Sequence, residues 1–560
     1  MSEHTSQDQV RDLADRIWEL RLDRSPVYAS IIGDHRRDHL LDDYSQEALQ
    51  ESLSELREIQ DQAAAIPQEG LEEQDAITLD LVIHQAETSI QAIESHYLLG
   101  VVDTFIGPPS SLLVGVNNLK AASTEQEEAY RERWSKMGSF IDQVIERHRQ
   151  EFATGRYPAA RVVRRVVSGI DSYLDTDTST DPFAVSAAGG DEDSAGKARD
   201  VVSSTIRPAY RRYRDFLVEE AVPFARDDDH VGLLNVPDGE RLYAELVRQY
   251  TSLPADPQEL HDFGREEAEE RLPEEWARVG SEALDTTNLD EIFSRIRTDP
   301  AFSYESGDEM VADALYTIER AWAVVDAWFG ARPATPCDVK EVPHAVAPDL
   351  PPAYYMAPSS DGSRPGTYYI NTYDPPSRKR PMFEAIHFHE AIPGHHFDRS
   401  LAMEIEGLPP FRQRFNAFAH IEGWGLYAER LADEMGLYTS ALDRLGMLSA
   451  DAWRAGRLVV DTGMHALGWS RQRAIEWMLK WTPVTPLVVE QEIDRYIGMA
   501  GQALAYKAGQ REIIALRRQA EATLGERFDI KGFHDAVLTA GGLTLPVLNR
   551  RVQDWIERQA

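Results

Sequence analysis

The sequence contains a single cysteine, Cys337, in 560 residues. One thiol excludes an intrachain disulfide framework, and it excludes any metal or redox site built on paired cysteines. A metal ion bound by this chain must therefore use histidine and carboxylate ligands.

Long apolar runs are also missing. No run of about 18 apolar residues occurs, which is the length that a membrane-spanning helix needs. The first twenty residues show neither a basic segment nor an apolar segment of the secretory type. We expect a soluble, cytoplasmic protein that has no membrane partner.

Basic residues are scarce relative to acidic ones. Asp and Glu number 95 against 58 Lys and Arg, the net charge is -37, and lysine occurs only eight times. Such a surface repels phosphate, so nucleic acid is not an expected partner. An acidic, lysine-poor surface fits a halophilic cytosol, where salt screens the self-repulsion. An ordinary acidic soluble protein is the alternative.

Hydrophobic residues make up 42% of the chain, enough for a large core, and the length favours two or more lobes. Helical spacing of apolar residues dominates, and we divide the chain into a mostly helical scaffold lobe (1–332) and a catalytic lobe (333–560). The acidic, aperiodic stretch 175–196 predicts an exposed loop. Residues 333–380 are rich in proline and predict a β-hairpin around 361–366.

From residue 382 onward the pattern is helical again. We expect helices near 382–400, 409–435, 439–465, 471–480, 486–521 and 531–558.

The first of these helices holds four histidines and a carboxylate in ten residues, His387 to His396. In a zinc-peptidase HExxH helix the two histidines are four residues apart and share one face, with the glutamate as general base. Four residues after His389 the chain has Pro393. If Pro393 and Gly394 loop out, His395 takes the second position; if the helix continues, His396 returns to that face about 10 Å further along. We favour His395.

A third ligand is expected from the next helix. Glu422 and Glu429 are seven residues apart and share one face of an apolar, aromatic helix. We predict Glu422 as the third ligand and Glu429 as a group that orients a histidine. Zinc suits two histidines, a glutamate and an open position, although manganese, cobalt or iron are alternatives.

The motif HEAIPGHH, with DGSRPGTYYINT before it and EGWGLYAE, DTGMHALGWS and GQALAYKAG after it, resembles the domain of unknown function 885 family. That family is in turn similar to the gluzincin zinc peptidases, which include thimet oligopeptidase, angiotensin-converting enzyme and Taq-type carboxypeptidase. The resemblance implies a mainly α, two-lobed fold with a small sheet and a metal at the floor of a deep cleft. It implies His389 and His395 as ligands, Glu390 as general base and Glu422 as the downstream glutamate.

Further residues are candidates for substrate and transition-state contacts. Tyr506, or else Tyr496, is expected to stabilise the oxyanion, as a tyrosine does in the gluzincins, and His465 is a further candidate donor. Arg364 and Arg495 could bind a substrate carboxylate. The segment with Tyr369 and Asn371 could pair with a peptide backbone as an added strand.

Three functions are consistent with these residues. The first is a zinc metallohydrolase that cleaves short peptides as a dipeptidase, carboxypeptidase or oligopeptidase, with Glu390 as general base. The second is hydrolysis of a non-peptide amide conjugate. The third is a helical binding protein whose structural metal is closed by His396 or Glu429 as a fourth ligand. The sequence carries no indication of oligomeric state.

Overall fold

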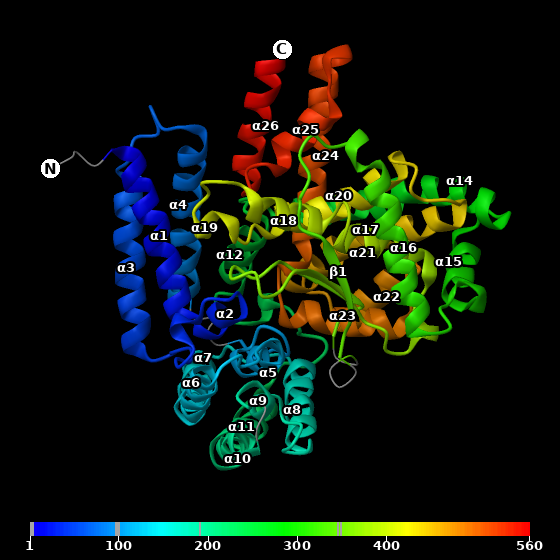
Figure 1. The fold of residues 1–560 in the computed structure, drawn as a ribbon. Coiled ribbons are helices and arrows are strands. Elements are labelled where there is room, and N and C mark those ends of the chain that lie inside the picture. The colour runs from blue at the N-terminus through cyan, green and yellow to red at the C-terminus, as the bar shows by residue number, and fades with distance from the viewer. Residues whose placement is uncertain (1–4, 96–100, 190–191, 344–346, 348–349) are drawn as a thin grey trace.

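The computed structural model describes residues 5–95, 101–189, 192–343, 347 and 350–560. Within these ranges helices dominate, and strands form one three-stranded sheet (Figure 1). The predicted mainly α fold is confirmed. No helix among the described residues is long and apolar enough to cross a bilayer.

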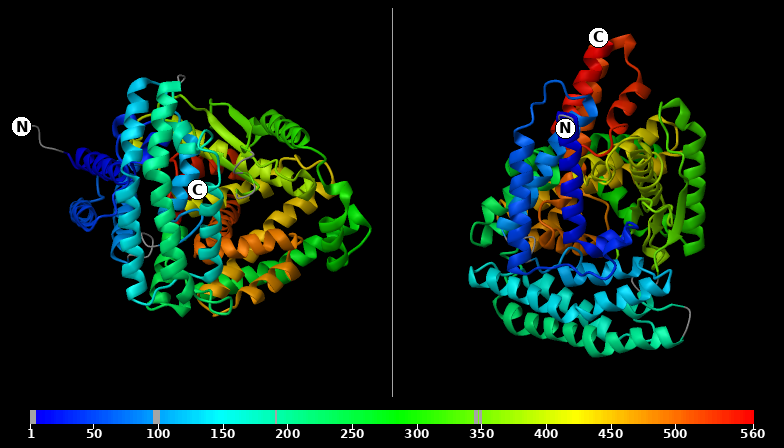
Figure 2. Two further views of the ribbon diagram at one scale, coloured as in Figure 1. Left: turned by 90° about the horizontal axis from the view of Figure 1, so that it is seen from below. Right: turned by 60° about the vertical axis from the view of Figure 1, so that its left-hand side comes forward.

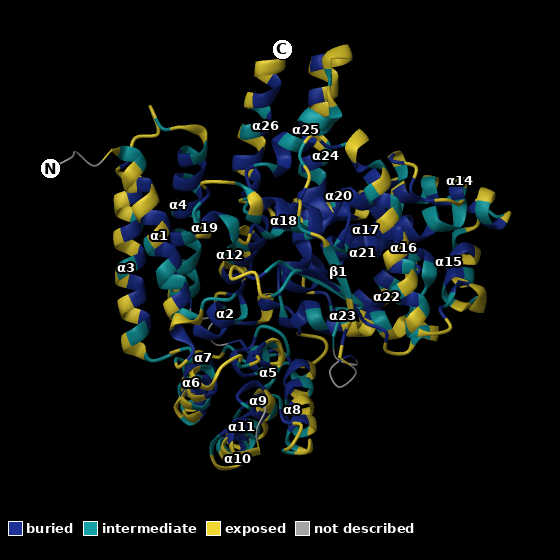
Figure 3. Ribbon diagram, in the orientation of Figure 1, coloured by how far each residue is buried: buried dark blue, intermediate teal, exposed yellow. Residues whose placement is uncertain are grey.

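Three long antiparallel helices stand side by side at the N-terminal flank of the molecule (Figure 1). They and the short helix that follows the first are α1 (Ser6–Arg24), α2 (Pro26–Ile31), α3 (Gln46–Ala64) and α4 (Glu73–Glu94). The first helix starts in a capping box between Thr5 and Asp8, and its apolar residues Val10, Leu13 and Ile17 recur at helical spacing and are buried. Its opposite face stays in solvent (Figure 3).

A second group of helices lies across the bottom of the molecule (Figure 2). Its members are α5 (Pro108–Gly115), α6 (Thr124–Ser135), α7 (Met137–Ala153), α8 (Ala160–Leu174), α9 (Pro182–Ser186), α10 (Glu192–Val201) and α11 (Arg207–Phe216). They enclose their own hydrophobic cluster. The prediction of an exposed loop over 175–196 was wrong in part, because α9 lies within it. Asp181 caps that helix and pairs with Arg207, and Phe183 is buried.

A third group of helices leads to the sheet. It consists of α12 (Gly239–Thr251), α13 (Pro257–Arg265), α14 (Leu272–Leu284), α15 (Leu289–Thr298) and α16 (Gly307–Val324). The sheet has the order β1-β3-β2, with β1 (Cys337–Glu341) parallel to β3 (Gly366–Ile370) and β2 (Ala353–Met356) antiparallel to it. The predicted hairpin is the β2–β3 pair, and the parallel strand β1 was not predicted.

The remaining helices form the centre and the top of the molecule. They are α17 (Arg380–Glu390), α18 (His395–Glu404), α19 (Pro410–Gln413), α20 (Phe418–Glu434), α21 (Ala441–His465), α22 (Arg471–Trp481), α23 (Pro486–Gly498), α24 (Ala505–Leu524), α25 (Ile530–Leu538) and α26 (Leu545–Gln559). The expected single helices over 382–400, 409–435, 486–521 and 531–558 are each two helices. A turn that contains glycine separates the two helices in all of these except 409–435, where residues 414–417 form the break.

The most deeply buried elements are α17, α20 and α21 (Figure 3). The largest hydrophobic cluster joins them to the N-terminal helices and contains side chains from both sides of residue 332, for example Trp276 and Trp424. The core is therefore continuous across that division. The expected deep cleft between two lobes stays a prediction.

Candidate metal centre

The helix that holds the first histidines ends in the middle of the motif. The amide of Ala391 still bonds to the carbonyl oxygen of His387, but Pro393 has no N–H to continue the ladder. A Cβ at Gly394 would stand 1.9 Å from the carbonyl oxygen of His389, so this close approach requires glycine. The chain breaks completely rather than bulging, and His395 begins α18. His389 and His395 thus come from two helices that meet end to end.

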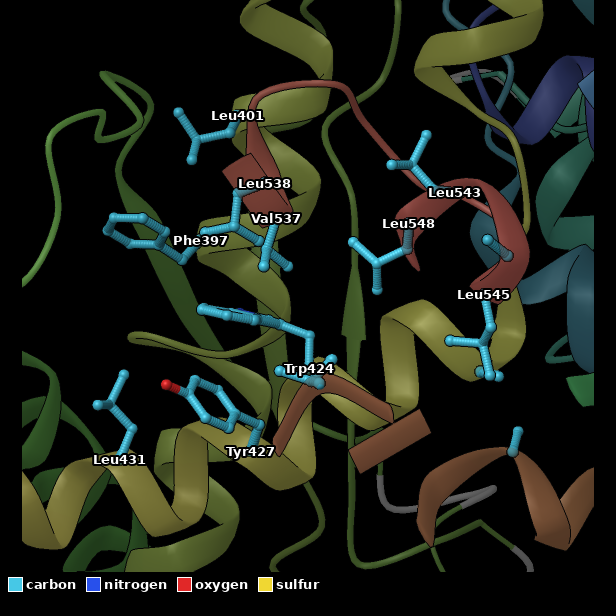
Figure 4. Packing of buried hydrophobic residues seen from close by; sticks show 14 of the residues in the cluster. Phe397, Leu401, Trp424, Tyr427, Leu431, Val537, Leu538, Leu543, Leu545 and Leu548 are labelled. Carbon is cyan, nitrogen blue, oxygen red and sulfur yellow. The ribbon is translucent and has the colours of Figure 1, made fainter. Parts of the chain in front are cut away.

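The next long helix, α20, is fitted closely against this break. The indole Nε1 of Trp424 donates to the carbonyl oxygen of Pro393 at 2.8 Å. Figure 4 shows Trp424 packed among Phe397, Val537 and Tyr427. One residue further, a Cβ at Gly425 would lie 2.6–2.9 Å from the ring of His389. The glycine and the tryptophan of the EGWG segment therefore place α20 directly on the two histidines.

Three side chains converge at this point. The ligand atoms of His389, His395 and Glu422 all lie within 4.8 Å of one another. The Nε2 atoms of both histidines are 3.4 Å from Oε2 of Glu422. Two donors that share a tetrahedral zinc with bonds of about 2.0–2.1 Å are about 3.4 Å apart, so this spacing fits one cation. Oε2 of Glu422 is buried without a hydrogen bond, so its lone pairs are available to a cation.

The ring nitrogen of His389 that faces away from Glu422 is hydrogen-bonded to a second glutamate. Its Nδ1 bonds to Oε1 of Glu429 at 2.8 Å, and Nη2 of Arg454 reaches the same oxygen at 3.4 Å. Burial lowers the pKa of His389, but Glu422 and Glu429 raise it more strongly, to about 9. Burial raises the pKa of Glu422, yet the two histidines hold it well below its usual range. The metal-free site is therefore an ion-paired cluster.

Glu390 is the last residue of α17 and is half-buried beside the histidines. Its carboxylate makes no hydrogen bond to the described residues. Burial raises the pKa of Glu390, while His395 and His389 lower it less. A carboxylate with a raised pKa and a free oxygen is suited to accept a proton.

The other histidines of the two motif helices point elsewhere. Nδ1 of His396 is 3.0 Å from the hydroxyl of Tyr355, and its Nε2 is 3.0 Å from the carbonyl oxygen of Thr335. His387 contacts the hydroxyl of Tyr368 at 2.8 Å. Both rings pack toward the sheet, so neither lies in the set of ligand atoms.

The two candidate tyrosines differ. The hydroxyl of Tyr496 donates to Glu492 at 2.6 Å and accepts from Arg457 at 2.7 Å, so it is fully used inside the fold. Tyr506 instead stacks on His389 with ring centroids 6.2 Å apart, and Arg457 lies 4.4 Å over its ring. Burial raises the pKa of Tyr506, and the nearby Glu422 raises it further. Only Tyr506 lies beside the metal ligands.

Two further candidates are used by internal hydrogen bonds. Nδ1 of His465 accepts from the amide of Leu233 at 3.1 Å, and Nε2 donates to the carbonyl oxygen of Tyr496 at 3.0 Å. Neither nitrogen is left to donate to a substrate. Arg495 donates to Glu492 at 2.9 and 3.2 Å and to Gln502 at 2.9 Å, so its guanidinium is already paired.

The hairpin candidates also have structural contacts. The β3 strand, which holds Tyr369, has partners on both sides and therefore offers no edge for an added peptide strand. Tyr369 stacks on Tyr354 at 5.0 Å. Asn371 donates to the carbonyl oxygens of Ala347 and Leu350, so its amide is already used within the fold. Arg364 remains a candidate for binding a substrate carboxylate, because its Nη1 is buried without a hydrogen bond in the described part of the chain.

Sequence reasoning missed Arg454 and Arg457 of α21, which lie behind Glu429 and Tyr506. Their spacing of three residues puts both on one face of that buried helix, and this spacing could have identified them from the sequence. Sequence reasoning also missed Asp398, which lies three residues after His395 and is fully buried.

Comparison with solved structures shows close relatives of this fold. The crystal structure of "the putative lipoprotein from Colwellia psychrerythraea" superimposes with a TM-score of 0.92 at 26% identity, covering 99% of this chain and 100% of that one. "A putative lipoprotein of unknown function" from Shewanella oneidensis matches with a TM-score of 0.75 at 18% identity, covering 98% and 99%. No curated protein matches the sequence.

The family described as "Bacterial protein of unknown function (DUF885)" matches residues 26–552, which include the whole candidate centre. The chain belongs to the DUF885 family.

Proposed function

We propose that this protein is a zinc-dependent hydrolase that cleaves amide bonds of short peptides. One observation carries the proposal: Nε2 of each of two histidines lies 3.4 Å from the same carboxylate oxygen, as donors to one tetrahedral zinc do, and the carboxylate of Glu390 lies near enough to feel their charge. The proposed relation to the gluzincin peptidases rests on the same residues.

The ligand set favours an open site over a closed structural one. A structural zinc needs four protein ligands. The two residues considered for the fourth position are committed elsewhere: His396 bonds to Tyr355 and Thr335, and Glu429 is bonded to the opposite nitrogen of His389. The alternative function, a binding protein whose structural metal has four protein ligands, is therefore less well supported.

Zinc bound here would supply a Lewis acid that polarises a carbonyl and acidifies water. Glu390 would take a proton from the attacking water at its carboxylate and pass it to the leaving amine. Tyr506 would donate its hydroxyl to the oxyanion, since it lies next to His389 and Glu422. Glu429 would keep Nδ1 of His389 protonated and the ring oriented, and Arg454 would hold the carboxylate of Glu429 in place.

Short peptides are proposed as substrates because the ligand set and general base match those of peptidases that the motif resembles. A non-peptide amide would use the same groups. Turnover of a peptide library, as in the experiment below, is what favours peptides over such an amide. A cytoplasmic location, and the absence of membrane and nucleic-acid partners, stay predictions.

The decisive variant is Glu390→Gln, tested with a peptide library on zinc-loaded protein. We expect zinc content equal to wild type and turnover lower by at least about 100-fold, which is the lower range for loss of a general base. The matched control is Glu404→Gln, a carboxylate on α18 that caps the backbone of Ala334 and Thr335. Equal turnover in Glu390→Gln and wild type would remove the proposed mechanism.

A further inference from the structure

The two histidines of the centre differ in the hydrogen bonding of their second ring nitrogen, Nδ1. His389 has a direct carboxylate partner for Nδ1, whereas Nδ1 of His395 is buried and has no hydrogen bond in the described part of the chain. If Nε2 of His395 binds a cation, its remaining proton must sit on Nδ1. A buried N–H without an acceptor costs about 1–3 kcal/mol, so this nitrogen needs a partner.

Unpaired polar atoms gather next to this histidine. Asp398 follows His395 by three residues on α18, so the two side chains are neighbours on the helix surface. Oδ2 of Asp398 accepts from Nε of Arg399 at 2.8 Å, while Oδ1 is buried and unpaired. His420 of α20 is fully buried with both nitrogens unpaired, and its Nε2 is 3.9 Å from that Oδ1.

The separation of Asp398 and His420 fits a molecule that bridges them. A gap of 3.9 Å is too long for a hydrogen bond. An internal water makes about three hydrogen bonds to buried groups that lack other partners. Nδ1 of His395, Oδ1 of Asp398 and a ring nitrogen of His420 supply that number from three side chains.

The charge of Asp398 suits the acceptor role. Burial raises the pKa of Asp398, but the guanidinium of Arg399, which also donates to this carboxylate, lowers the pKa below its ordinary value. An ionised carboxylate can accept on both oxygens, and only one is used by Arg399. His420 is fully buried, and its ring nitrogens can accept or donate a hydrogen bond.

We propose that Asp398 is the positioning residue of His395 and that it acts with His420 through one buried water that accepts from Nδ1–H. This inference rests on the proposed metal site. It gives each histidine ligand its own carboxylate: Glu429 directly for His389 and Asp398 through water for His395. The fixed tautomer and ring angle would then strengthen metal binding.

The test measures Zn²⁺ affinity by competition with a chromophoric chelator for wild type, His395→Ala, Asp398→Ala, His420→Ala and Glu404→Gln. We expect Asp398→Ala to weaken Zn²⁺ binding by about 10–100-fold, as loss of an outer partner does in known sites. His420→Ala should weaken it by a smaller factor, and Glu404→Gln should bind as wild type.

The visible spectrum of the Co²⁺-loaded protein gives a second readout. A misoriented His395 should shift the d–d bands in Asp398→Ala, whereas a purely structural defect would leave them unchanged in the fraction that still binds. If Asp398→Ala fails to fold, His420→Ala decides alone, because it leaves the pair of Asp398 and Arg399 intact.

The experiment distinguishes failure of the role of Asp398 from failure of the proposed metal site. Normal Zn²⁺ binding and an unchanged Co²⁺ spectrum in both Asp398→Ala and His420→Ala, together with loss of binding in His395→Ala, would overturn this inference alone. Absence of Zn²⁺ binding by wild type, or wild-type affinity in His395→Ala, would overturn the proposed metal site and this inference with it.

Discussion

Two sets of residues that the sequence singles out behave differently in the fold. His389, His395, Glu422 and Glu429, on α17, α18 and α20, meet around one point. Tyr496, His465, Arg495 and Asn371, on α21, α23 and the loop after β3, are bonded into the structure instead. The first set was predicted from spacing, with two histidines six residues apart in one motif and two glutamates on one helix face, whereas each member of the second set was chosen singly for its chemistry. Shared spacing is therefore the better guide to a site.

The largest expected effect compares the two adjacent histidines. His395→Ala should weaken Zn²⁺ binding by more than about 100-fold, because it removes a ligand rather than an outer partner. His396→Gln should keep wild-type affinity and instead cost about 1–3 kcal/mol of unfolding free energy, since it disturbs buried hydrogen bonds to Tyr355 and Thr335. Chelator competition and urea unfolding measure the two. The opposite pattern would make His396 the ligand.

The next comparison is between the two tyrosines. Tyr506→Phe should lower kcat by about 100-fold or more with little change in stability, as loss of one oxyanion donor does. Tyr496→Phe should lower stability by about 1–3 kcal/mol, because Arg457 and Glu492 each lose a buried partner. Steady-state kinetics and thermal unfolding distinguish these outcomes. Equal kcat in Tyr506→Phe and wild type would exclude the phenol from the reaction.

A third comparison sets two helical glycines against each other. Gly425→Ala places a methyl group 2.6–2.9 Å from the ring of His389. The substitution should cost about 1–3 kcal/mol and reduce Zn²⁺ affinity by about 10-fold or more. Gly169→Ala on α8 meets nothing within 4 Å and should instead stabilise by about 0.5–1 kcal/mol. Unchanged metal binding in Gly425→Ala would show that α20 does not fix His389.

The smallest expected effect is the dependence of Zn²⁺ affinity and of stability on pH. The pKa of His389 is raised from 6.5 to about 9 by its two carboxylates, against the effect of burial. Zn²⁺ must displace that proton, so affinity should rise about tenfold per pH unit between pH 7 and 9. In metal-free protein the same ion pairs stabilise the fold fully below pH 6.5. That contribution, about 3 kcal/mol, is lost as pH rises through 9.

Calorimetric titrations in two buffers of different ionisation enthalpy count the protons released. Glu429→Gln should lower the slope of affinity against pH, because it removes one carboxylate that raises the pKa of His389. A flat pH profile for wild type would contradict the ion-paired description of the metal-free centre.

The sequence predicts the helical fold and the pairing of Glu422 with Glu429 because both depend on local periodicity. Glu422 and Glu429 share a face at seven residues in any regular helix. The sequence could not show that Pro393 and Gly394 end one helix and begin another, because a bulge satisfies the same steric limits. Nor could it show that β1 lies parallel to β3, since that pairing joins segments far apart in the chain. The buried partners of Tyr496 and Arg495 likewise depend on tertiary packing alone.

The break between α17 and α18 has a consequence for local unfolding. Because His389, His395 and Glu422 come from three separate helices, a cation held by them would act as a cross-link that joins α17, α18 and α20. The first turn of α18 could then not open without releasing the ion. Amide hydrogen exchange in that turn should therefore slow by the factor 1 + [Zn²⁺]/Kd, while exchange in the distant helix α8 stays constant.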